Sequence, residues 1–176
     1  KKSSFFKEKI IRIKRPKKLS NKNSPSMDYI NHTLNKLEKL QQSFEYVIVL
    51  EPTSPLTDLN DIRETYKLLT SKSDITSVVS VQKNIKHHPS FNFRLNKKKL
   101  LKPIFKNSNI RRQDVSSLYY LDGSIYASKV SSLKKFKSFI QNNTRAYFPS
   151  SYKFIEIDDQ FDFHLAELIK KYYLKY

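Results

Sequence analysis

The chain has 176 residues, enough to bury one sizeable hydrophobic core, and we expect a single domain over residues 1–176. Hydrophobic residues make up 38% and aromatic residues 13%, which excludes a disordered chain, and no apolar run is long enough for a membrane-spanning helix. The absence of cysteine excludes disulfides and thiolate metal sites. The basic segment Lys1–Lys18 lacks the long apolar stretch of a signal peptide, so we expect a cytoplasmic protein.

The net charge of +18 raises the question of a nucleic-acid partner. Only seven of the 34 basic residues are arginine, and the lysines are spread along the whole chain. This distribution is typical of a compositional bias rather than of a dedicated surface, so we expect no nucleic-acid partner. A basic nucleic-acid-binding module remains the alternative from another class, and it predicts a contiguous basic face and a steep salt dependence of binding.

Strands and helices alternate in the first half of the chain. In order, we predict a strand at Ile10–Ile13, a helix begun by Ser24-Pro25, a strand at Tyr46–Leu50, a helix capped by Asp58 and a strand at Ser77–Val81. This order predicts an α/β fold with a mostly parallel sheet flanked by helices. The strands at Tyr46–Leu50 and Ser77–Val81 are fully apolar apart from small serines, and we expect them to be neighbours in that sheet.

The second half is less regular. The predicted elements are a strand at Phe91–Leu95, a hairpin or exposed loop at Asn96–Asn109, a β-like stretch at Tyr119–Ser128 interrupted by Asp122-Gly123, a short helix around Leu133, strands at Arg145–Phe148 and Tyr152–Ile157, and a closing helix from about Asp159.

The segment Leu50–Leu56 comes directly after a buried strand, where α/β sheets place their ligands. Two prolines fix its backbone, while Thr53 and Ser54 offer hydroxyl groups to a polar substrate. An ordinary strand-to-helix loop is the alternative.

Adjacent arginines occur at Arg111-Arg112, followed by Gln113. A guanidinium group binds carboxylate or phosphate through two parallel hydrogen bonds, which lysine cannot do. In a chain dominated by lysine, this pair indicates an anion-binding position, with a surface charge pair as the alternative.

Two carboxylates, Glu156 and Asp158, alternate with isoleucines in the predicted strand at Tyr152–Ile157 and just after it. Residues two apart on a strand point to the same side, so these carboxylates would form an oxygen-rich site suited to Mg²⁺. The alternative is that Asp158 or Asp159 only caps the last helix. The adjacent His87 and His88 would point to opposite faces, so we expect a structural or substrate-positioning role for them rather than metal binding.

Together these segments resemble the acylneuraminate cytidylyltransferase family. That family carries Leu-Gln-Pro-Thr-Ser-Pro-Leu-Arg, then His-Pro, Arg-Gln, Asn-Gly-x-x-Tyr and Asp-x-Asp before a helix. The corresponding segments are, in order, Leu50–Thr57, His88-Pro89, Arg112-Gln113, Asp122–Tyr126 and Glu156–Asp158, and Arg15-Pro16 resembles an Arg-Pro segment before the family's first long helix. The match covers nearly the whole chain. Each motif alone is weak, but the occurrence of all of them in the family's order is specific for that family.

The resemblance implies a Rossmann-like nucleotidyltransferase fold, usually dimeric, that uses CTP, a 2-keto sugar acid and Mg²⁺ to form a CMP-sugar and pyrophosphate. Asp158 and Glu156 would bind the metal, and Arg112 would bind the sugar carboxylate. The implied substrate-binding residues are Glu51, Thr53, Ser54, Gln113, Asp122 and Gly123.

The family's glycine-rich CTP-binding loop has no counterpart here, because the single glycine is Gly123. We therefore expect the chain to be the larger, C-terminal part of such a domain and to be inactive alone. Four departures stand at motif positions: Glu51 for Gln, Thr57 for Arg, Asp122 for Asn and Glu156 for Asp. These departures are compatible with a different keto sugar acid as the substrate, or with a loss of activity.

Overall fold

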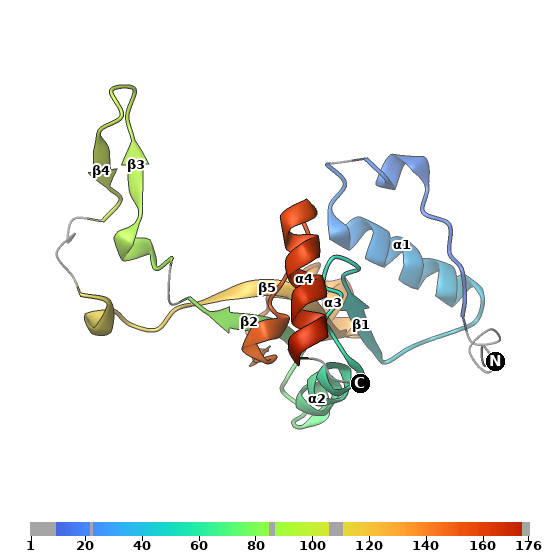
Figure 1. Cartoon of the computed structure of the whole chain (residues 1–176). Helices are drawn as coiled ribbons and strands as arrows, with labels where there is room; N and C mark the ends of the chain where they lie inside the picture. Colours follow the sequence, from blue (N-terminus) through green and yellow to red (C-terminus); the bar gives the residue numbers. More distant parts are fainter. Residues whose placement is uncertain (1–9, 22, 85–86, 106–110, 174–176) are drawn as a thin grey trace.

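A four-stranded sheet forms the centre of the structure, a computed structural model that describes residues 10–21, 23–84, 87–105 and 111–173 (Figure 1). The strands lie in the order β1 (Tyr46–Leu50), β5 (Tyr119–Lys129), β2 (Ser77–Lys83) and β6 (Thr144–Tyr147). Strands β1, β2 and β6 run in one direction and β5 runs against them. The predicted α/β fold class, with a central sheet flanked by helices, is confirmed.

The prediction that β1 and β2 are neighbours is wrong. Strand β5 lies between them and pairs with both in antiparallel register. The sequence order of the first half does not reveal this insertion, because the inserted strand comes about 40 residues after β2 in the chain.

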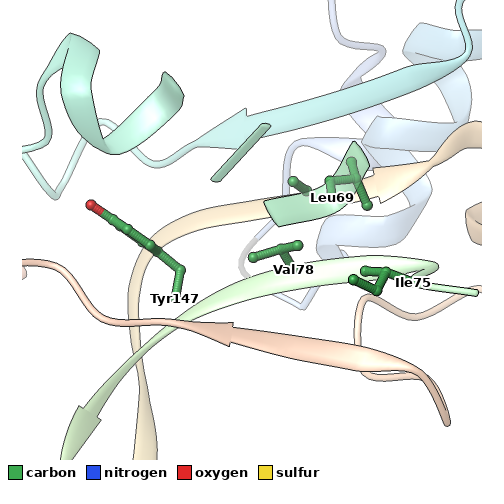
Figure 2. Close-up of a cluster of buried hydrophobic side chains, with 5 residues drawn as sticks. Leu69, Ile75, Val78 and Tyr147 are labelled. Atoms are coloured by element: carbon green, nitrogen blue, oxygen red, sulfur yellow. The ribbon is translucent and has the colours of Figure 1, made fainter. Parts of the chain in front are cut away.

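Helices cover both faces of the sheet. Helix α2 (Leu59–Thr70) packs on one face, and helices α1 (Ser26–Lys39) and α3 (Val130–Phe136) pack on the other. The clusters are Leu69, Ile75, Val78, Ala127 and Tyr147 on the α2 side, four of which Figure 2 labels, and Ile30, Leu34, Val130 and Leu133 on the other side. Successive β1 side chains alternate between these clusters, as a strand buried on both faces requires.

The start of helix α2 follows the sequence prediction. The Asp58 carboxylate accepts hydrogen bonds from the amides of Asn60 at 2.9 Å and Asp61 at 3.1 Å, and the Asp61 carboxylate accepts the Asp58 amide at 2.9 Å. This reciprocal capping box satisfies amides that the first helical turn leaves without partners. Helix α1 differs, because Pro25 occupies its cap position and Ser24 makes no capping hydrogen bond.

A hairpin stands away from the sheet at the end of an extended arm (Figure 1). It consists of β3 (Phe93–Leu95) and β4 (Leu101–Pro103), paired in antiparallel register, which confirms the hairpin predicted in this region. Residues 106–109, the end of the region predicted as a hairpin or exposed loop, lie outside the described residues.

Two predicted strands are absent. Ile10–Ile13 has no regular structure, because an isolated strand gains no ladder hydrogen bonds without a partner. Tyr152–Ile157 is also no strand: the 3₁₀ turn η5 (Ser151–Lys153) precedes an irregular segment that leads into helix α4 (Gln160–Tyr173). Strand β5, in contrast, continues through Asp122-Gly123 as one element with an irregular register.

No described helix has the length and apolar character that crossing a membrane requires.

Candidate functional site

Three segments meet at the end of β1. They are the loop from Glu51 to Ser54, the irregularity of β5 at Gly123, and the segment from Glu156 to Asp158. The Ile157 amide donates to the Thr53 carbonyl oxygen at 2.8 Å. Two of the three predicted site segments therefore lie side by side although they are about 100 residues apart in the chain.

The backbone of β5 bulges toward this site. Val79 pairs with Tyr126 and Val81 pairs with Leu121, so four residues of β5 stand opposite Ser80 alone. Gly123 lies in the bulge with φ +79°, and a Cβ atom there would come within 3.0 Å of Glu156 Oε2. Only glycine accepts both this left-handed conformation and this close approach without strain.

The Asp122 side chain is buried beneath the bulge. Its carboxylate accepts hydrogen bonds from Ser80 Oγ, from Ser124 Oγ at 2.9 Å and from Gln82 Nε2 at 3.3 Å. These donors compensate the cost of burying the charge. Sequence reasoning missed Ser80 and Gln82, although a serine inside the apolar run of β2 was a detectable signal.

Four carboxylates raise the proton affinity of the site. The pKa of Glu156 is raised by partial burial and then by the charges of Asp158, Glu51 and Asp122. The pKa of Tyr126 is also raised, by burial first and by Glu156 and Glu51 next. Burial is the larger cause of both shifts, and the further contribution of the neighbouring carboxylates indicates a negative potential, which favours a cation or hydrogen-bond donors.

Glu51 is connected to the segment before α1. The Tyr29 hydroxyl donates to Glu51 Oε1 at 3.3 Å, and the Arg15 guanidinium lies 4.5 Å above the centre of the Tyr29 ring. Glu51 and Tyr126 also line a cavity of about 290 Å³ next to Lys137. Tyr29 has no signal in the sequence beyond its place on the predicted helix.

The helix cap distinguishes the two neighbouring aspartates. Asp159 Oδ1 accepts the amides of Phe161 at 2.8 Å and Asp162 at 3.0 Å, so Asp159 caps α4. The capping alternative therefore applies to Asp159 and is wrong for Asp158. The strand argument that placed Glu156 and Asp158 on one face is also wrong, but the two carboxylates still act on each other.

Glu156 and Asp158 could supply two carboxylates to a Mg²⁺ ion that takes its further ligands from a substrate. Among the described residues, no three or more His, Cys, Asp or Glu side chains gather into a metal-binding group. Mg²⁺ at phosphate sites commonly takes only one or two carboxylates and completes its shell with phosphate oxygens and water. Glu156 and Asp158 would hold the ion in that manner.

The predicted anion-binding pair lies elsewhere. Arg112 and Gln113 belong to the 3₁₀ turn η4 (Arg112–Asp114), which Figure 1 shows on the arm side, beyond the start of β5 and away from α4. The Arg112 side chain lies outside the described residues, while Arg111 Nε pairs with Asp114 Oδ2 at 2.7 Å on the surface. One copy of the chain does not bring η4 beside Asp158, so the role of Arg112 and Gln113 stays a prediction.

His88 has a local structural contact. It is buried, and its Nδ1 accepts the Ser90 amide at 3.2 Å at the start of the turn η3 (Pro89–Phe91). This agrees with the expected structural role.

Comparison with known proteins finds curated relatives at modest identity. The chain is 28% identical over 151 residues to the N-acylneuraminate cytidylyltransferase of Streptococcus agalactiae serotype III (strain NEM316). The matched region covers 86% of this chain and 35% of that protein. The chain is similar to N-acylneuraminate cytidylyltransferases. The protein of the same name from Escherichia coli O18:K1:H7 (strain RS218 / NMEC) is 26% identical over 166 residues, or 89% of this chain and 36% of the relative.

This similarity to N-acylneuraminate cytidylyltransferases confirms the resemblance predicted from the motifs. No family model matches the chain. The chain spans about a third of the length of the curated relatives it matches.

Proposed function

We propose that this chain forms the sugar-acid side of a cytidylyltransferase active site. The reaction would transfer CMP from CTP to an N-acylneuraminate-like 2-keto sugar acid and release pyrophosphate. The observation that carries the proposal is the meeting of the β1 loop, the Gly123 bulge and the Glu156–Asp158 segment, at the positions of the family motifs. A cytidylyltransferase for another keto sugar acid is the closest alternative.

In this reaction a hydroxyl oxygen of the sugar forms a bond to the α-phosphorus of CTP, the hydroxyl proton is lost, and the bond from that phosphorus to the pyrophosphate oxygen breaks. Catalysis of such a transfer depends mainly on positioning and on neutralising charge. Mg²⁺ bound at Glu156 and Asp158 would supply charge neutralisation at the phosphates. The residues of the chain bind and orient the sugar.

The loop after β1 supplies the proposed sugar contacts. Ser54 is buried, and its Oγ has no hydrogen-bond partner among the described residues, so this hydroxyl could donate to a substrate only once the loop uncovers it. Glu51 accepts from Tyr29 and retains further acceptor capacity. A carboxylate at position 51 favours a sugar that presents hydroxyl or amino donors there.

The triphosphate requires donors from outside this set. Gly123 is the only glycine of the chain and is held in the β5 bulge, so no glycine-rich loop can surround the phosphates. We expect no CMP-sugar from the purified chain with CTP, Mg²⁺ and N-acetylneuraminate. Detectable turnover would contradict this part of the proposal.

The decisive experiment concerns Asp158 in the chain completed with a nucleotide-binding segment. Asp158→Asn removes a charge and no helix cap, so stability should change little while turnover falls about a hundredfold or more. Asp159→Ala is the matched control: it should lower the free energy of unfolding by about 1 kcal/mol and leave the Mg²⁺ dependence unchanged. Both are measured as turnover against Mg²⁺ concentration and as melting curves. Normal turnover in Asp158→Asn would remove the metal role.

We also propose that the protein is a homodimer. The arm exposes apolar side chains on both strands of its hairpin, and the start of β5 exposes more at the base of the arm. Clusters of exposed apolar side chains are typical of association surfaces.

A further inference from the structure

A buried lysine lies beside the candidate site but outside it. Lys153 is 5% exposed, and its Nζ contacts Asp58 Oδ2 at 2.6 Å and Asp61 Oδ2 at 2.8 Å. Lysine is almost never buried to this extent unless its charge is paired. Asp61 Oδ1 also accepts the Tyr147 hydroxyl at 2.7 Å, so the cluster joins η5, α2 and β6.

Helix α2 does not need this lysine for its cap. Asp58 Oδ1 accepts the two capping amides, and Asp61 Oδ2 accepts the Asp58 amide. Lys153 instead uses Asp58 Oδ2, which the cap does not use, and adds a second donor to Asp61 Oδ2. The lysine therefore attaches η5 to a helix start that is already complete.

The attached segment leads directly to Glu156. Ile155 is buried, and the Ile157 amide donates to the Thr53 carbonyl oxygen at 2.8 Å. The backbone from Lys153 to Ile157 is thus fixed at its first residue, its middle and its last. Between these anchors, Glu156 is held with its carboxylate 3.0 to 3.3 Å from the Cβ position of Gly123.

We propose that Lys153 is a positioning residue, which fixes the segment from Lys153 to Ile157 on helix α2 and thereby holds Glu156 against Gly123. The observed contacts alone support the positioning of Glu156 by Lys153. Only the importance of that positioning for catalysis rests on the proposed function. Burial alone would lower the pKa of Lys153, but the bonds to Asp58 and Asp61 outweigh it and the net shift is upward, so the lysine is charged at neutral pH.

A pair of variants separates positioning from stability. Lys153→Met leaves two uncompensated carboxylates, so the melting temperature should fall by roughly 10 °C. Adding Asp58→Asn returns the cluster to its original net charge of one negative unit and keeps a capping side chain, since Asn caps about as well as Asp. The double variant should therefore recover most of the lost melting temperature without recovering the attachment of η5.

The readout is local and is made by NMR on the whole chain without ligand. In the double variant, we expect protection of the Ile157 amide against hydrogen exchange to fall about tenfold relative to the β2 amides. The nuclear Overhauser contacts between Gly123 Hα and the Glu156 side chain should weaken. Lys134→Met, which removes an exposed ion pair with Glu38 between α3 and α1, is the control and should change neither signal.

Native-like protection of Ile157 and unchanged Gly123–Glu156 contacts in the double variant would overturn the proposal and leave Lys153 a purely stabilising residue. The NMR signals involve no substrate or metal. A failure of the cytidylyltransferase proposal would therefore leave them unchanged, and the two failures can be told apart.

Discussion

Gly123 meets two demands at one position. Its φ of +79° lies in the left-handed region, and the Glu156 carboxylate lies only 3.0 to 3.3 Å from where a Cβ atom would stand. The backbone demand comes from the bulge in β5, whereas the steric demand comes from a segment more than 30 residues later in the chain. One residue thus connects the local shape of a strand to the placement of an acidic side chain.

Gly123→Ala tests both demands. The backbone cost of a left-handed alanine is about 1–2 kcal/mol in the free energy of unfolding, and displacement of the flexible Glu156 side chain adds a smaller amount. We expect the double variant Gly123→Ala with Glu156→Ala to be less destabilised than the sum of the single variants, because the clash is then absent. Denaturant unfolding of the four proteins measures this difference. Strict additivity would show that Glu156 does not lie against Gly123.

At the scale of elements, the start of α2 combines a helix cap with an ion cluster. Asp58 serves both, through different oxygens. Burial alone would raise the pKa of Asp58, but the hydrogen bond from Lys153, the capping amides and the lysine charge outweigh it, and the net pKa is lowered.

The direction of this shift predicts how stability depends on pH. A carboxyl group with a lowered folded-state pKa adds stability above the ordinary aspartate pKa of about 4, and that stability is lost as the pH falls through the folded-state pKa. Asp58→Asn should therefore be less stable than the native chain at pH 7, by on the order of 1 kcal/mol because the side chain is partly open to solvent, and the gap should close toward pH 2–3. Urea unfolding across this range measures the gap. A gap that is constant with pH would contradict the ion pair.

At the scale of the whole molecule, the arm exposes large apolar side chains on both strands of its hairpin. Leu95 and Leu101 face each other across the hairpin with 64% and 65% of their surface exposed, and Phe105 is exposed close by. A two-stranded hairpin alone is marginally stable in water, so burial against another surface would support it.

Dimer formation through the arm can be tested by sedimentation. We expect the native chain to sediment as a dimer, and Leu95→Lys with Leu101→Lys to shift it to monomer with little loss in melting temperature. Leu40→Lys, a change at a comparably exposed leucine just after α1, is the matched control and should leave the dimer intact. A native chain that is monomeric at all concentrations, or a control that dissociates equally, would contradict an arm-mediated dimer.

Local sequence signals predict the features whose causes lie within a few residues. The apolar run of β1, the cap of α2 by Asp58, the hairpin region and the closing helix were all predicted, because periodicity, capping and turn signals act over one or two helical turns. The order of the site motifs was also visible, and with it the similarity to a family.

The way those pieces meet depends on contacts between distant residues, which the folded structure reveals. The insertion of β5 between β1 and β2, the replacement of the predicted strand at Tyr152–Ile157 by an anchored turn, and the burial of Lys153 against carboxylates 92 and 95 residues away have no local signal. Lys153 looks like any other lysine in a lysine-rich chain, because its burial depends on partners that folding brings from another part of the sequence. Long-range contacts determine the order of strands in a sheet and the burial of charged side chains. A single sequence contains the residues that make these contacts but does not show which residue contacts which.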